Sequence, residues 1–218
     1  MRALAAAVDD RWPAPVSAAF LDFDAPTVAA ALAMAEPTIV VPALLTSAYH
    51  GRVDLPGVLA TAPAPVRLAP VLGPTEPGDE PHPMLIAALR RRLSEVDARC
   101  DGLALIAAGT SFAAARAGVD TVAAALAGAL RMPCVAGYAS AAAPTAAEAV
   151  AAVRAAGATR VAVASYFLAP GRLYDAAVAS ARSAGVVGVA EPLGVTLVDL
   201  VLARAAVTLG DALVSAPS

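Results

Sequence analysis

Short apolar runs alternate with longer Ala-rich segments along the chain, and this alternation predicts strands and helices in turn. The clearest run, Ile39 to Leu45, is rich in apolar and β-branched residues and is typical of a parallel strand buried on both faces. Val16 to Phe23 and Val66 to Leu72 are two further predicted strands. Helices are predicted over residues 1–11, 26–35, 53–61 and 84–99. The order of the elements favours an α/β fold with a parallel sheet and right-handed crossovers.

The second half of the chain repeats the first. Three different short motifs recur in the same order about 120 residues later. The matched pairs are Ala25-Pro26-Thr27 with Ala143-Pro144-Thr145, Leu44-Leu45-Thr46 with Phe167-Leu168-Ala169, and Val71-Leu72-Gly73 with Pro192-Leu193-Gly194. We therefore predict two tandem domains, residues 1–99 and 100–218, each a small parallel sheet flanked by helices.

The two copies differ in the side chains that follow their strands. Asp22 and His50 stand at two strand ends of the first copy, where the second copy has Ser140 and Leu173. Because the carboxyl ends of parallel strands meet at one edge of a sheet, we expect Asp22 and His50 to converge on one ligand. A carboxylate and an imidazole with open coordination positions suit a divalent transition metal that is held loosely. The second copy is predicted to be degenerate at this place.

Composition excludes several classes of partner. The net charge is −3, and the basic residues are arginines dispersed along the chain apart from 90–92, so no nucleic-acid partner is expected. Although 59% of the residues are hydrophobic, Pro, Gly or charged residues interrupt the apolar stretches, so no membrane span is expected. Cys100 and Cys134 are too few for a disulfide framework. The N-terminal apolar stretch is too short for a signal peptide. Together with the small number of cysteines, this indicates that the protein works in a reducing cytoplasm.

Four segments together resemble a known family, the sirohydrochlorin chelatases, in its long two-domain form. They are FLDFDAPT, VVPALLTSAYHGRVDLP, IAAGTS and ASYFLAPGRLYD, and the similarity covers nearly the whole chain in the right order. These are the cobalt- or iron-inserting class II chelatases of cobalamin and sirohaem synthesis. The resemblance implies that the two domains enclose a cleft, in which Co²⁺ or Fe²⁺ is inserted into a bound tetrapyrrole. The metal is then a substrate, and no organic cofactor is expected.

The resemblance also implies roles for particular side chains. In the family a histidine and an acidic residue bind the metal, and His50 and Asp22 stand at these places. Two pyrrole N–H protons must leave as the metal enters, so His50 is the candidate base, with Asp22 holding the metal or orienting the imidazole. Tyr49 is expected to form a wall of the cleft. Arg52 and Arg172 are candidates to bind the carboxylates of the macrocycle.

One element of the family pattern is missing from the first copy. The family begins with a strand that ends in His-Gly-Ser, and the second copy has its counterpart in Asp101 to Ala108, followed by Gly109-Thr110-Ser111. Ala108 stands where the histidine would be. Because a first strand lies inside a doubly wound sheet, we expect the chain to begin one strand late and about 15–25 further residues to precede Met1. The alternative function is a non-catalytic relative that binds a metal or a tetrapyrrole.

Overall fold

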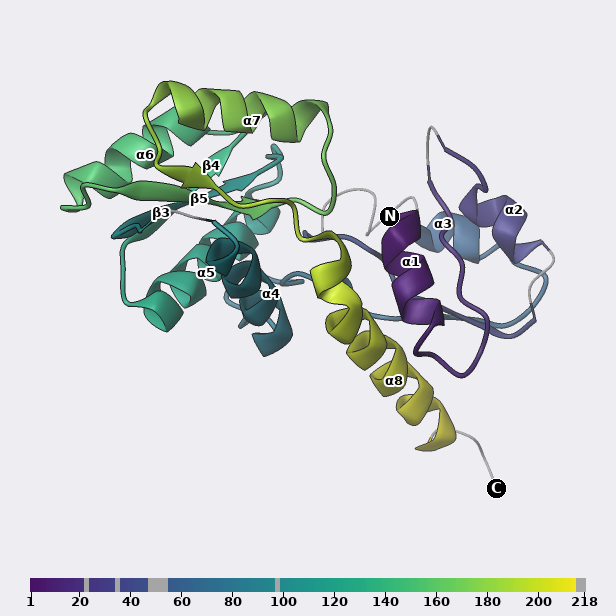
Figure 1. Cartoon of the computed structure of the whole chain (residues 1–218). Helices are drawn as coiled ribbons and strands as arrows, with labels where there is room; N and C mark the ends of the chain where they lie inside the picture. The colour runs from purple at the N-terminus through teal and green to yellow at the C-terminus, as the bar shows by residue number, and fades with distance from the viewer. Residues whose placement is uncertain (22–23, 34–35, 47–54, 97–98, 215–218) are drawn as a thin grey trace.

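The computed structural model describes residues 1–21, 24–33, 36–46, 55–96 and 99–214, and it has two parallel sheets, one in each half of the chain. The two halves lie side by side (Figure 1). Among the described residues of the first half, two strands are found, β1 and β2, which pair in parallel from Thr38 with Val66 to Val40 with Leu68. Its elements are α1 (Arg2–Asp9), α2 (Val28–Leu32), β1 (Thr38–Val40), α3 (Leu55–Leu59), β2 (Val66–Leu68) and α4 (Pro83–Ser94).

The second half contains a larger sheet, in which four parallel strands lie in the order β4-β3-β5-β6. Its elements are β3 (Gly102–Ala107), α5 (Ala113–Leu130), β4 (Cys134–Tyr138), α6 (Ala146–Ala155), β5 (Val161–Tyr166), α7 (Arg172–Ser183), β6 (Gly188–Val189), a 3₁₀ helix η2 (Gly194–Leu197) and α8 (Val198–Val214). The strand predicted over 101–108 is therefore confirmed as β3, and it lies inside the sheet. The α/β class with two small parallel sheets flanked by helices is confirmed as well.

Helices cover both faces of the second sheet. Successive side chains of a strand point to opposite faces, so neighbouring residues of one strand pack against different helices. On β3, Leu103 and Leu105 pack in the cluster that contains α4 and α5, whereas Ala104 and Ile106 pack against α6 and α7. By length and composition α5 could cross a membrane, and within the described residues it alone meets that test. Val119, Val122 and other residues on its inner face are buried against β4 and α4, as in a core helix.

The structure of the two halves confirms the repeat predicted from the motifs, down to individual backbone hydrogen bonds. Each half has a cis peptide bond at the matched alanine–proline pair, 25–26 and 143–144. Four backbone bonds occupy equivalent places in pairs: Phe20 N to Pro26 O with Tyr138 N to Pro144 O (both 2.9 Å), and Leu72 N to Leu44 O (2.9 Å) with Leu193 N to Phe167 O (2.8 Å). The backbone of the two halves is therefore arranged in the same way from β4 onward in the second half and from residues 16–20 onward in the first.

All three strand predictions in the first half were wrong in extent. In the described part of Val16 to Phe23, residues 16–20 form no strand and make a single β-bridge, between Phe20 and Thr27. β1 ends at Val40, whereas the apolar run predicts a strand to Leu45. The third, Val66 to Leu72, corresponds to the shorter β2, which ends at Leu68. The physical reason is pairing: the matching strands β4 and β5 both pair with β3, and no described strand takes that place in the first half. Accordingly β5 is buried throughout, whereas β1 is only half-buried.

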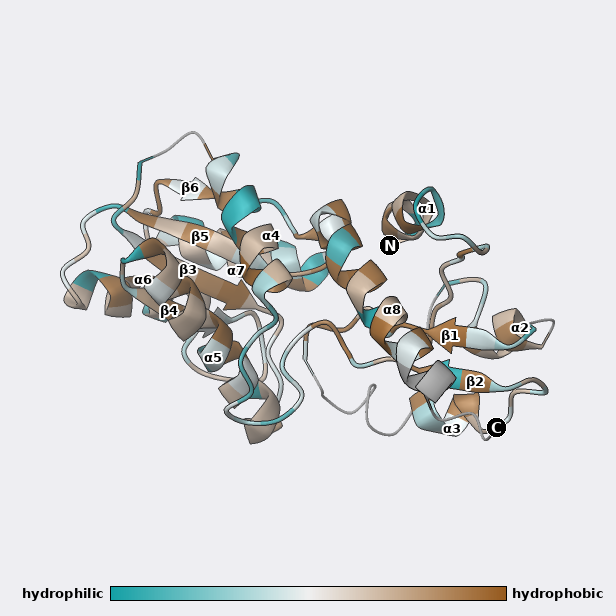
Figure 2. Ribbon diagram, turned by 90° about the horizontal axis from the view of Figure 1, so that it is seen from below, coloured by the Kyte–Doolittle hydropathy of each residue, from teal (hydrophilic) through white to brown (hydrophobic). Residues whose placement is uncertain are grey.

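The last helix of each half packs on the other half, which the sequence pattern does not indicate. α4 contacts α5 and β5, and its Leu85 and Leu89 are almost completely buried there. α8 contacts α1 and β1, and an ion pair of 2.7 Å between Arg11 and Asp199 lies at the same junction. Figure 2 shows α8 leaving the second half and running beside β1. The halves are therefore joined by a reciprocal exchange of helices as well as by the chain between them.

Candidate functional site

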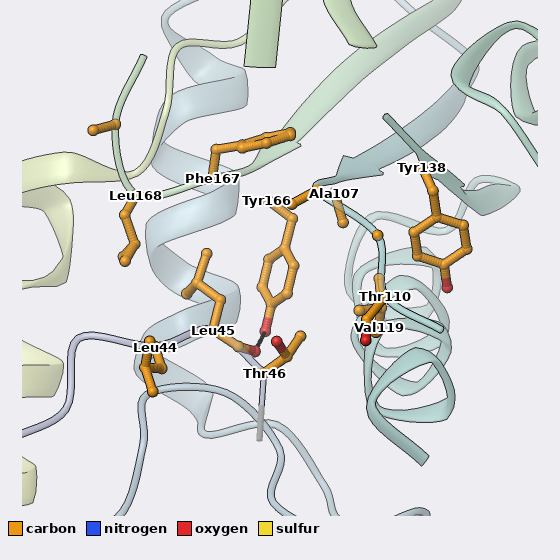
Figure 3. Close-up of a pocket in the computed structure, with 13 residues that line it drawn as sticks. Leu44, Leu45, Thr46, Ala107, Thr110, Val119, Tyr138, Tyr166, Phe167 and Leu168 are labelled. Carbon is orange, nitrogen blue, oxygen red and sulfur yellow. Dashed lines mark hydrogen bonds between the residues drawn. The ribbon is translucent and has the colours of Figure 1, made fainter. Parts of the chain in front are cut away.

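A cavity of about 280 Å³ lies where the two halves meet, at the carboxyl ends of their strands (Figure 3). Its lining residues are Leu44, Leu45, Thr46, Ala107, Ala108, Gly109, Thr110, Val119, Tyr138, Tyr166, Phe167, Leu168 and Ala169. Two of the lining segments, 44–46 and 167–169, are matched motifs of the internal repeat, so equivalent loops of the two halves meet across it. This confirms the predicted cleft between the halves.

The cavity wall holds one buried hydrogen bond between the halves. The hydroxyl of Tyr166, at the end of β5, donates to the backbone carbonyl of Leu45 over 2.6 Å. Burial raises the pKa of Tyr166 far above its ordinary value, so the hydroxyl stays protonated and acts as a donor. A Cβ atom on Gly73 would lie 1.8 Å from the same carbonyl oxygen, so only glycine fits there. The backbone just before residues 47–54 is thereby fixed.

Four of the five predicted site residues lie outside the described residues: Asp22, Tyr49, His50 and Arg52. Their convergence on one ligand therefore stays a prediction. The fifth, Arg172, is the first residue of α7 and is exposed. Among the residues that the structure describes, no group of three or more His, Cys, Asp or Glu side chains could hold a metal ion.

The last described residues before the two predicted ligands lie in different parts of the fold. Thr46, four positions before His50, lines the cavity. Leu21, directly before Asp22, packs against the cluster formed by Val28, Leu32 and Leu55. The segment that carries His50 therefore begins at the cavity.

In the second half, the groups at the matching strand ends are engaged within the fold. Ser140, which stands at the place of Asp22, donates from its hydroxyl and its backbone N–H to the carbonyl of Ala108, both at 3.1 Å. Gly109 has φ +92°, and a Cβ atom there would lie 1.9 Å from the carbonyl oxygen of Ser140. The ends of β3 and β4 thus form a tight, uncharged corner of the cavity.

Two tyrosines of the cavity were missed by the sequence analysis, although both end a buried strand. Tyr138 ends β4, and its hydroxyl lies 3.5 Å from the carbonyl oxygen of Arg116. Burial and the nearby carboxylate of Asp120 raise the pKa of Tyr138 to about 12. The signal was available in the sequence, because a tyrosine at the end of an apolar strand carries its polar tip toward the strand-end cleft.

The cleft continues past Leu168 and Ala169 into a second cavity of about 310 Å³. Arg92 and Glu191 are the charged residues of its lining. Arg92 donates to Glu95 at 2.8 Å and to the backbone carbonyl of Leu193 at 3.3 Å, and its Nε is buried without a partner. Arg92 thus ties α4 to the loop after β6.

Comparison with known proteins identifies relatives for both halves. The model of one protein family, CbiX, matches residues 1–96 and again residues 102–206. The solved structure of SirB from Bacillus subtilis with Fe³⁺ superimposes with a TM-score of 0.78 at 18% identity, over 98% of this chain and 90% of that one. A sequence search among curated proteins finds no match.

Two further solved structures share the fold. The sirohydrochlorin chelatase SirB from Bacillus subtilis subspecies spizizenii, in complex with cobalt, gives a TM-score of 0.75 at 18% identity, with 98% of this chain and 90% of that one covered. CbiX, described as the terminal enzyme for siroheme biosynthesis in denitrifying bacteria, gives 0.63 at 24% identity, with 94% and 88% covered.

Proposed function

The chain belongs to the CbiX family, and from this we propose that it is a sirohydrochlorin chelatase, which inserts Co²⁺ or Fe²⁺ into a tetrapyrrole of cobalamin or sirohaem biosynthesis. The observation that carries the proposal is the cavity between two family-matched halves, at the strand ends where α/β sheets bind their ligands. One solved relative with this fold is a sirohydrochlorin chelatase in complex with cobalt.

The described lining of the cavity supports the assignment of the base to His50. Metal insertion releases two pyrrole protons, which need an acceptor near neutral pH. Tyr138 and Tyr166 cannot serve, because burial raises the pKa of each hydroxyl, and the other described lining residues carry no carboxylate or imidazole. His50 follows Thr46 closely in the chain, and imidazole has the suitable proton affinity. Asp22 is the proposed second ligand of the entering metal.

The uncharged lining also suits the substrate. A tetrapyrrole has a flat apolar ring and an anionic rim of carboxylates, so the ring favours the apolar cavity and the rim favours guanidinium groups. Arg172, which is exposed at the start of α7, and Arg52 are the proposed partners of the carboxylates, and Tyr49 is the proposed wall. In this proposal the divalent metal is a substrate and the reaction uses no organic cofactor. The protein acts in the cytoplasm.

The test is anaerobic incubation with sirohydrochlorin and Co²⁺ or Fe²⁺, followed by the absorbance of the metal-free macrocycle. His50→Ala should abolish most of the rate above the non-enzymatic background. His82→Ala is the matched control, because His82 is the N-cap of α4, where its Nδ1 accepts a hydrogen bond from the backbone N–H of Met84. Its loss should cost about 1 kcal/mol of stability and leave the rate unchanged.

Two results would contradict the proposal. Equal rates for wild type and His50→Ala would remove His50 from the chemistry. Tight binding of sirohydrochlorin without metallation above background would favour the alternative, a non-catalytic relative that binds a metal or a tetrapyrrole.

A further inference from the structure

The helix α4 begins with a hydrogen bond that only a neutral histidine can accept. His82 is the N-cap of α4, and its Nδ1 accepts from the backbone N–H of Met84 over 3.2 Å. In a protonated imidazole both ring nitrogens carry a hydrogen, so Nδ1 can no longer accept this bond. The positive charge would also stand at the amino end of a helix, where it is unfavourable. Protonation of His82 therefore removes the cap of α4.

A second basic side chain acts on His82 from the other exchanged helix. α8 contacts α4, and Arg204 of α8 has its Nε buried without a hydrogen-bond partner among the described residues. Burial and then the charge of Arg204 lower the pKa of His82 below its ordinary value of 6.5. The guanidinium of Arg204 keeps its charge, although burial lowers its pKa as well. The half-buried imidazole thus stays neutral more easily than an exposed one.

Within the described part of the chain, no carboxylate offsets the charge of Arg204 at His82. The elements that pack against α4 are α5, β5, η2 and α8, and the loop before it ends at His82. Their other ionisable groups have partners of their own or are exposed: Asp79 with Thr75 and the N–H of Glu76, Asp120 with Tyr138, Arg116 with the carbonyl of Thr110, Tyr166 with the carbonyl of Leu45, Asp199 with Arg11, and the exposed Glu80. On α4 itself, Arg91 and Arg92 pair with Glu95, and Arg90 is exposed.

We propose that His82 and Arg204 form a pH switch at the junction of the two halves: neutral His82 caps α4, whereas protonated His82 loses the cap and repels Arg204. Because α4 packs on the second half and α8 on the first, the added charge weakens the junction between the halves. The switch is independent of the proposed function, since neither residue is in the lining of either cavity.

The lowered pKa of His82 sets the direction of the effect. Above pH 6.5 the imidazole is neutral in the folded and in the unfolded chain, and its contribution to stability is fully present. As the pH falls below 6.5 the unfolded chain takes up the proton first, so this contribution is lost as the pH falls through the folded-state pKa of His82. The switch therefore acts on the acid side of neutrality.

The first experiment follows the titration of His82 itself. The chain has two histidines, so His50→Ala leaves a single imidazole, and NMR of its ring protons against pH gives the titration midpoint. The midpoint should lie below 6.5. In the same background Arg204→Met, which keeps an apolar side chain, should raise the midpoint, whereas the control Arg90→Met removes an exposed charge from α4 and should leave it unchanged. A midpoint at or above 6.5, or an equal effect of both arginine variants, would overturn the proposal.

The second experiment measures the consequence for the junction, again in the His50→Ala background. His82→Asn is the matched variant, because asparagine caps a helix but does not titrate near neutral pH. Between about pH 7.5 and about pH 5.5 the urea midpoint should fall with His82 and stay nearly constant with His82→Asn. Over the same range, hydrogen-exchange protection of the Met84 amide, corrected for the intrinsic exchange rate, should fall about fivefold with His82 alone, as expected for one lost N-cap. An equal fall in both proteins would overturn the proposal.

Discussion

The hydroxyl of Tyr166 in the second half donates a buried hydrogen bond of 2.6 Å to the carbonyl of Leu45 in the first. Both residues line the cavity, and the dashed line in Figure 3 marks the bond between them. The bond therefore couples the second half to the chain that leads toward His50. An alteration of this contact should affect both the stability of the protein and the predicted metal site.

Tyr166→Phe should lower the free energy of unfolding by about 1–3 kcal/mol, because the buried carbonyl of Leu45 loses its donor. Urea denaturation measures the change. Tyr138→Phe is the comparison, since its hydroxyl makes a long bond of 3.5 Å to the carbonyl of Arg116 and otherwise interacts with the exposed carboxylate of Asp120, which water can solvate in its place, so this change should cost less. An equal decrease in the free energy of unfolding in both variants would show that the Tyr166 bond does not stabilise the protein more than the contacts of Tyr138 do.

Gly73→Ala should be strongly destabilising. Its Cβ atom would lie 1.8 Å from the Leu45 carbonyl oxygen and 2.7 Å from the Tyr166 hydroxyl, so the contact between the halves must open. Gly128→Ala in α5 is the control, because a Cβ atom there meets nothing within 4 Å. It should raise stability by about 0.5–1 kcal/mol, as alanine favours a helix interior. Thermal melts of both variants decide the point.

Asp101 predicts a dependence of stability on pH. Hydrogen bonds from the backbone N–H of Arg160 and from the hydroxyl and backbone N–H of Thr159 hold the pKa of Asp101 below its ordinary value of 3.8. A depressed folded-state pKa stabilises the protein above pH 3.8, and that contribution is lost as the pH falls through the folded-state pKa.

Asp101→Ala should therefore be less stable than wild type at pH 7, and the difference should shrink as the pH falls below 3.8. Urea titrations at a series of pH values measure it. The exposed Asp10→Ala serves as the control and should change stability little at neutral pH. A difference that stays constant down to the lowest pH would contradict the assignment.

The helix exchange predicts where damage to α4 appears. Leu89→Ala removes a side chain that is 1% exposed, and it should cost about 2–5 kcal/mol. Although Leu89 precedes the second half in the chain, hydrogen exchange should accelerate in β3 and β5, with which α4 packs. The control Leu32→Ala, in the cluster with Val28 and Leu55, should accelerate exchange in the first half instead.

The sequence predicted the fold wherever local pattern decides it. The β-branched runs and the matched motifs led to two α/β copies, and the apolar run 101–108 became β3. The pattern failed where the outcome depends on partners elsewhere in the fold. Residues 16–20 have the pattern of a strand but make a single β-bridge, between Phe20 and Thr27. Nothing in the periodicity of α4 or α8 indicates which sheet each helix covers.

The site was predicted in part. The loop after Leu45 was expected at a ligand-binding strand end, the cleft followed from the family resemblance, and that resemblance was correct. Tyr138 and Tyr166 were missed although their place at strand ends could have pointed to the cleft, whereas the contact of Tyr166 with the distant carbonyl of Leu45 could not be read from the sequence. Asp22 and His50 stay predictions, and their assignment depends on the proposed mutational test.

The exchange of α4 and α8 makes the chain resemble a domain-swapped dimer whose subunits have become one polypeptide. A protein of half this length would leave one face of its sheet without its covering helix unless a second subunit supplied it. Gene duplication and fusion of such a dimer would place the former subunit interface along the present cleft. Once fused, one copy can lose its metal-binding side chains while the other keeps them, which a symmetric dimer of identical chains cannot do.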